Sequence, residues 1–154
     1  MITEKQVFEW LQDHPLASIA TLTTEGQPTM AAVYTYIDEK FNCYFVTKVV
    51  TRKSFNLSEN EKIGVLWCDE ENLSVCEMNG KAHELLVKEE VARVITRLLE
   101  ITSYIRSAYW VPPVAQLKGS QYIVYRVDPE EINFTNYLVV QGSDQEPDKL
   151  SFNP

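Results

Sequence analysis

The spacing of apolar and polar residues divides the chain into helical and extended segments. Apolar residues at helical spacing follow a Thr3–Gln6 capping box, which predicts a helix of about ten residues that ends near His14. A shorter helix is predicted over 50–60. A longer amphipathic helix is predicted over about 88–105, because its apolar residues recur every three or four positions. The remaining regular segments have a different period.

These other segments are short, rich in aliphatic and aromatic residues, and bounded by turn-forming residues. Strands are predicted over 16–23, 29–37, 41–47, 62–68, 73–86, 121–127 and 132–137. Gly80 inside the longest segment predicts a β-bulge or a sharp bend, and Asp128-Pro129 is predicted to separate the last two strands. Closely spaced strands favour antiparallel pairing, so the pattern predicts a mainly β fold, a barrel or curled sheet with helices over its ends.

The length of the chain, 154 residues, predicts one domain. We assign residues 1–142 to this domain. Residues 143–154 are polar and contain two prolines, which predicts a loose C-terminal tail. The segment 107–119 is predicted to be a loop that contains the aromatic residue Trp110.

Charge and composition limit the partners. Lys and Arg number 14 against 22 Asp and Glu, a formal net charge of −8, and such a surface repels nucleic acids and anionic membranes. The two histidines are far apart and the three cysteines have no C-x-x-C spacing, so neither a protein-held metal nor a disulfide framework is expected. The sequence also shows no secretory signal or membrane-spanning run, so a cytoplasmic location is expected.

One junction carries candidate chemistry. Thr47 and Lys48 end a predicted strand, and Thr51, Arg52 and Lys53 begin a predicted helix. The helix macrodipole disfavours cations at this end, and a bound anion would resolve the conflict. Free backbone N–H groups, two hydroxyls and two cations could converge there on a phosphate, although a solvated Arg-Lys pair is the alternative. No nucleophile motif or Gly-rich phosphate loop is present, so no catalytic residue is assigned.

The same segment resembles the flavin-binding segment of the pyridoxamine 5′-phosphate oxidase-like split-barrel family. The resemblance covers roughly residues 5–135. It rests on Thr47 followed by Thr51-Arg52-Lys53, on Leu16 to Leu22, on Gly26-Gln27-Pro28, on Lys62 to Trp67 and on Asn79-Gly80-Lys81-Ala82. It implies a six-stranded antiparallel split β-barrel with flanking helices. It also implies a homodimer with FMN, or in some branches a deazaflavin or haem, in clefts between the subunits.

The resemblance also implies roles for individual residues. Arg52 and Lys53 would grip the cofactor phosphate, with hydroxyl hydrogen bonds from Thr47 and Thr51. The residues Val33, Tyr34 and Thr35 would lie along the flavin ring, and Val46 would precede the phosphate loop. The loop near Trp110 is expected to help bury the dimer interface.

The resemblance therefore favours an FMN-dependent oxidoreductase acting on a small-molecule redox substrate. Oxidation of vitamin B6 phosphates is not expected. The family's two basic positions on the second strand read Met30 and Thr35, and the chain has only one dense basic cluster. Two alternatives stay open: a flavin- or haem-binding carrier or sensor without turnover, and a cofactor-free dimeric scaffold.

Overall fold

The computed structural model describes residues 1–103, 121–138 and 146–154. The elements are α1 (Glu4–Asp13), β1 (Leu16–Leu22), β2 (Pro28–Tyr34), β3 (Tyr36–Ile37), β4 (Cys43–Lys48), α2 (Arg52–Glu59), β5 (Lys62–Asp69), β6 (Ser74–Glu84), α3 (Lys88–Ser103), β7 (Tyr122–Asn136) and β8 (Asp148–Phe152). Every strand pair is antiparallel, in the order β2-β1-β5-β6-β7-β4-β3, with β8 paired to β7. The predicted mainly β, antiparallel fold is confirmed.

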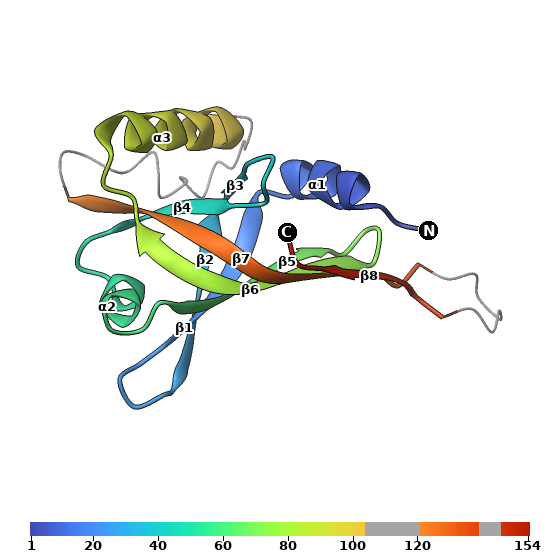
Figure 1. The fold of residues 1–154 in the computed structure, drawn as a ribbon, viewed down its shortest axis with the longest axis horizontal. Helices are drawn as coiled ribbons and strands as arrows, with labels where there is room; N and C mark the ends of the chain where they lie inside the picture. Colours follow the sequence, from blue (N-terminus) through green and yellow to red (C-terminus); the bar gives the residue numbers. More distant parts are fainter. Residues whose placement is uncertain (104–120, 139–145) are drawn as a thin grey trace.

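The sheet curls so that β2 and β4, which are separated by four strands in the sheet order, approach each other. Figure 1 shows α1 and α3 along one side of this curled sheet and α2 beside β1. Thr35 lies at the corner between β2 and β3, and its N–H donates to the Pro15 carbonyl at 2.7 Å, one position beyond the last β1–β2 pair of Leu16 with Tyr34. The prediction of one strand over 29–37 is therefore wrong. The segment forms two strands, β2 and β3, which lie at opposite edges of the sheet.

The predicted bulge at Gly80 is confirmed, because the β6–β7 register shifts between Asn79 and Gly80. A Cβ at residue 80 would lie 2.3 Å from the Asp128 carbonyl oxygen, so only glycine fits this approach. The predicted strand break at Asp128-Pro129 is wrong, since β7 runs through it. Between Val127 and Ile132, β7 has neither β4 nor β8 as a second neighbour, so the missing N–H of Pro129 removes no bond to them.

The C-terminal residues also differ from the prediction. Residues 148–152 form β8 and pair with 132–136, so they are part of the sheet and not a loose tail. Leu150 and Phe152 pack against the main hydrophobic cluster, and the Phe152 ring meets the Phe41 ring edge to face at 5.0 Å. These two alternating apolar side chains explain the strand. With β3 and β8, the described residues form eight strands, against six expected from the family resemblance.

The core has two parts. The larger cluster lies inside the curled sheet and receives Val7 and Leu11 from α1 and Leu57 from α2. The smaller cluster lies under α3, where Val94 and Leu98 are fully buried. Among the described residues, no helix combines the length and apolar character needed to cross a bilayer.

Candidate functional site

The N-terminus of α2 is shaped by hydroxyl groups. Thr51 is the N-cap residue, and its Oγ1 accepts the Ser54 N–H at 3.3 Å. The Thr51 Oγ1 also lies 3.1 Å from the Thr47 Oγ1 and 2.8 Å from the Ser54 Oγ. The Ser54 hydroxyl in turn donates to the Lys48 carbonyl at 2.9 Å. The predicted hydroxyl donors Thr47 and Thr51 are thus brought together, and they already bond within the β4–α2 junction.

The two predicted cations lie together on the other side of this junction. Arg52 and Lys53 border a small cavity of about 110 Å³. The remaining walls come from the β1–β2 hairpin: Ile19, Thr21, Thr29, Met30 and Ala31. We call this cavity the cation pocket. The pocket places two positive side chains beside a helix N-terminus, as a phosphate site requires, while the two threonine hydroxyls in its wall bond within the protein.

The two cations differ in exposure. Arg52 is exposed, whereas Lys53 is half-buried, and burial lowers the pKa of the Lys53 ammonium. No acidic residue occupies the first turn of α2. Neither Arg52 nor Lys53 has an ion-pair partner among the described residues. Partial burial of an ammonium without a carboxylate partner is destabilising, and an incoming anion would relieve that cost.

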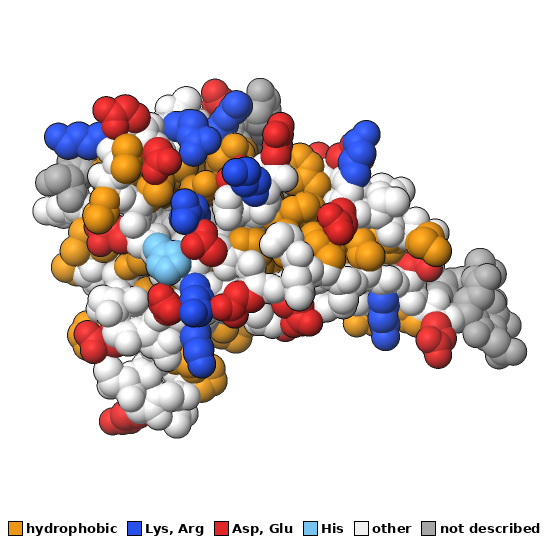
Figure 2. Space-filling view, viewed as in Figure 1, with side chains coloured by type: hydrophobic (Ala, Val, Ile, Leu, Met, Phe, Trp, Pro, Cys, Tyr) orange, Lys and Arg blue, Asp and Glu red, His pale blue; other side chains and the backbone are white. Residues whose placement is uncertain are grey.

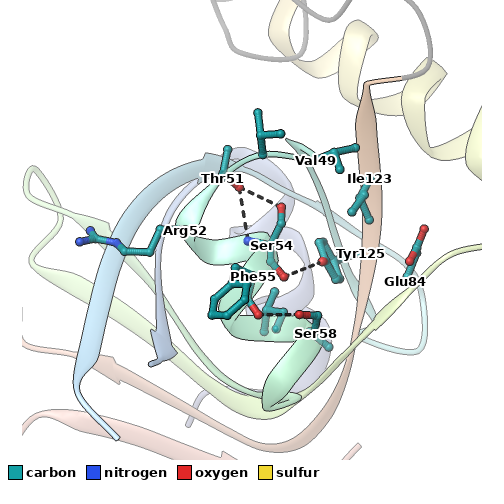
Figure 3. A pocket seen from close by; sticks show the side chains of 12 residues that line it. Val49, Thr51, Arg52, Ser54, Phe55, Ser58, Glu84, Ile123 and Tyr125 are labelled. Carbon is teal, nitrogen blue, oxygen red and sulfur yellow. Dashed lines mark hydrogen bonds between the residues drawn. The ribbon is translucent and has the colours of Figure 1, made fainter. Parts of the chain in front are cut away.

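A second, larger cleft lies on the opposite side of α2. It measures about 670 Å³ and is lined by Val49, Val50, Thr51, Arg52, Ser54, Phe55, Leu57, Ser58, Ala82, Glu84, Ile123 and Tyr125. Figure 3 shows that the Arg52 side chain points away from the wall formed by Ile123 and Tyr125. The Tyr125 hydroxyl faces the Ser54 carbonyl at 3.5 Å, and burial raises the pKa of Tyr125. The charge of Arg52 is therefore directed toward the β1–β2 side of α2.

The other predicted cofactor residues line neither cavity. Val33 is buried in the larger core cluster, and Tyr34 and Val46 pack together in the smaller cluster under α3. Thr35 is 2% exposed, and its hydroxyl donates to the Pro15 carbonyl at 3.0 Å and accepts the Trp67 Nε1–H at 2.9 Å. The structure thus gives these four side chains packing and bonding partners inside the protein. The loop near Trp110 lies outside the described residues.

Sequence reasoning missed one buried polar cluster beside the cation pocket. The Asn56 Nδ2 donates to the Thr21 Oγ1 at 3.0 Å and to the Thr29 Oγ1 at 2.9 Å. Thr21 and Thr29 are direct partners across the β1–β2 ladder, with their Oγ1 atoms 3.1 Å apart. An asparagine in the middle of a short helix was the available signal, because Asn is a poor helix former unless its amide has a partner.

The chain belongs to the pyridoxamine 5′-phosphate oxidase family, whose profile matches residues 3–136. Its fold is shared with a conserved hypothetical protein of Mycobacterium tuberculosis, with a TM-score of 0.74 and 18% identity over 94% of this chain and 96% of the other. PhzG from Burkholderia lata, solved with tetrahydrophenazine-1-carboxylic acid, gives a TM-score of 0.64 and 16% identity, over 97% and 91% of the two chains. A pyridoxamine 5′-phosphate oxidase-related, FMN-binding protein of Nostoc punctiforme gives 0.62 and 12%, over the full length of both. No curated protein matches the sequence.

Proposed function

We propose that this protein is an FMN-dependent oxidoreductase and that the cation pocket holds the FMN phosphate. The observation that carries the proposal is the pair of cations, Arg52 and Lys53, that lie at the N-terminus of α2 without an ion-pair partner in the described part of the chain. The family of the chain and the FMN-binding relative from Nostoc punctiforme support the same cofactor. A deazaflavin or a haem is the alternative cofactor.

The residues present fit a flavin phosphate. A phosphate dianion would receive charge-assisted bonds from Arg52 and Lys53 and backbone N–H groups from the first turn of α2. When bound, FMN supplies the hydride-transfer chemistry, so no acid or base of the protein is required for that step. The role left to this chain is to bind the cofactor, orient it and exclude water from it.

A homodimer is part of the proposal. The outward positions of β1, β2 and β5 carry the apolar residues Leu16, Ala20, Met30, Ala32 and Leu66. Among them Leu16, Met30 and Leu66 are exposed to 48%, 64% and 36%. Such a surface favours burial against a second copy. Met30 also lines the cation pocket, so a second copy on this face would cover the pocket and exclude water from it.

Vitamin B6 phosphates are not the proposed substrates, because a phosphorylated substrate needs a second anion site. The basic residues on the outer side of β6 and β7 are paired with carboxylates instead. Lys81 lies 3.3 Å from Glu61, and the Arg126 Nε lies 2.7 Å from the Asp128 carboxylate. Figure 2 shows positive and negative side chains intermixed on the face that it displays. A neutral small-molecule redox substrate fits this charge distribution better.

The test is the visible spectrum of the purified protein, followed by titration with FMN and size measurement by light scattering. We expect a flavin spectrum or FMN uptake, a mass about twice 17.7 kDa, and turnover with a reductant and an electron acceptor. Flavin binding without turnover would favour a carrier or sensor, and a Soret band would indicate haem. A colourless protein that takes up no FMN would contradict the proposal and leave a dimeric scaffold.

A further inference from the structure

The helix that carries Arg52 and Lys53 has only eight residues and begins with two cations. A helix of this length is not stable alone in water, and cations at its N-terminus weaken it further. Its place on the sheet must therefore come from tertiary contacts. Leu57 anchors one side in the core, but an apolar contact is non-directional and does not fix the rotation of a helix about its axis.

The bonds of Thr51 and Ser54 hold the start of α2 to the β4 end and to Tyr125. The directional contacts between α2 and the β1–β2 hairpin come from the positioning cluster, which we define as Thr21, Thr29 and Asn56. Thr21 and Asn56 are 1% and 2% exposed. Both amide hydrogens of Asn56 are used, one on each threonine hydroxyl. The two hydroxyls also meet each other, and Thr29 reaches the Thr21 carbonyl at 3.4 Å. A buried network in which each donor finds an acceptor specifies one geometry.

The geometry of α2 connects this cluster to the two cations. Asn56 follows Arg52 by four residues and Lys53 by three, so all three lie on the same side of the helix. Thr21 and Thr29 also form part of the wall of the cation pocket. One set of bonds thus fixes both the helix face that carries the charges and the hairpin that completes the pocket.

We infer that Thr21, Thr29 and Asn56 are positioning residues that set where Arg52 and Lys53 stand relative to the β1–β2 hairpin, and so set the affinity for the FMN phosphate. This inference rests on the proposed function. It assigns no direct cofactor contact to Asn56. It also makes the cross-strand threonine pair part of the site although both hydroxyls bond within the protein.

The test compares Thr21→Val with Ser74→Ala. Thr21→Val keeps the shape of the side chain but leaves one Asn56 N–H unpaired. Ser74→Ala is the matched control, because the buried Ser74 hydroxyl accepts the Trp10 Nε1–H at 3.0 Å and lies away from the pocket. FMN affinity is measured by flavin fluorescence, and urea unfolding is measured in parallel. We expect about tenfold weaker FMN binding for Thr21→Val, less than about twofold for Ser74→Ala, and recovery in Thr21→Ser.

A second readout does not depend on the cofactor. Native-state amide hydrogen exchange should speed up in α2 for Thr21→Val and in α1 for Ser74→Ala. If Thr21→Val does not fold, Thr29→Val removes the half-buried hydroxyl instead, with the same expectations. Equal FMN affinity in Thr21→Val and wild type, with α2 exchange unchanged, would overturn the inference. Failure of the wild-type protein to bind FMN would instead reject the proposed function, and the exchange comparison would still decide whether the cluster positions α2.

Discussion

The N-termini of α1 and α2 have the same type of cap, but only α1 has an acid in its first turn. Thr3 caps α1 in a complete capping box with Gln6, and the first turn contains Glu4 and Lys5. Thr51 caps α2 in the same extended conformation, but its first turn contains Arg52 and Lys53 and no acid. The third described helix, α3, follows the pattern of α1, with two glutamates in its first turn.

The difference separates what a helix start needs for stability from what it needs for binding. A threonine cap and an acid both stabilise an N-terminus, and α1 has both. The first turn of α2 keeps the cap but has two cations and no acid, which lowers its own stability. The proposed phosphate would compensate for these charges, and the positioning cluster would hold so short a helix in place.

The largest effect is expected from reversing the charge at each helix start. Arg52→Glu should weaken FMN binding by roughly a hundredfold or more, because one charge-assisted bond is lost and a repulsion is added. The same substitution should raise the free energy of unfolding by about 0.3–1 kcal/mol, since an acid suits this position. Urea unfolding and flavin fluorescence measure the two effects.

The control is Glu4→Lys in α1. It should lower the free energy of unfolding by a similar amount and leave FMN affinity unchanged, because α1 lies away from the cation pocket. If Arg52→Glu binds FMN as well as wild type does, the difference between the two helix starts has no functional meaning.

Removing the caps should give a smaller effect. Thr3→Ala and Thr51→Ala should each lower the free energy of unfolding by about 1 kcal/mol, because each leaves an N–H of the first turn without its side-chain acceptor. Only Thr51→Ala should also weaken FMN binding, since the cap holds the turn that carries the cations. Paired denaturation curves and flavin titrations compare the two variants. A loss of FMN affinity in Thr3→Ala would show that the effect is not specific to the N-terminus of α2.

The pH dependence of binding should sharpen the role of Lys53. Burial lowers the pKa of Lys53 below its usual value of 10.5, so the ammonium is lost earlier than for an exposed lysine as pH rises. FMN affinity should therefore decline on the alkaline side in wild type. Lys53→Arg keeps its charge throughout and should show a flatter profile. Titrations between about pH 7 and pH 10 compare the two proteins, and identical profiles would remove Lys53 from the site.

The smallest expected effect is a change in stability at acid pH, and it involves the C-terminal end of α1. His14, the C-cap residue, lies 3.0 Å from the Asp69 carboxylate. The pKa of Asp69 is lowered, mainly by the hydrogen bond from the Asn72 side chain, with His14 contributing. The stability this provides is present above the unfolded-state pKa of about 4 and is lost as pH falls through the lower folded-state pKa. Asp69→Asn should flatten the acid side of the stability curve and leave FMN affinity at neutral pH unchanged.

The sequence predicted the fold where local signals agree with tertiary structure. The capping box at Thr3, the bulge at Gly80 and the helix start at Thr51 are local features, and the structure contains all three. The strand break at Pro129 was wrong because it depends on which strands lie beside β7. The final strand was missed because β8 is ordered by packing against a remote aromatic residue, Phe41.

The candidate site also has one part that the sequence predicts and another that only the folded structure shows. The clustering of Arg52 and Lys53 follows from adjacency in the sequence and a helix start, which can be read from the chain. The hydroxyls beside them, Thr21 and Thr29, come from a hairpin about thirty residues earlier, and only the folded register shows their position. A buried residue such as Thr35 looks the same in sequence whether its hydroxyl faces a ligand or a tryptophan.

Phosphate binding at the N-terminus of α2 is tested most directly by comparing FMN with riboflavin. The two ligands share the ring and the ribityl chain, and riboflavin lacks only the phosphate. Wild type should bind FMN roughly tenfold to a hundredfold more tightly than riboflavin, and the Arg52→Ala variant should lose most of this preference. Equal affinity of wild type for both flavins would show that the N-terminus of α2 does not bind the phosphate.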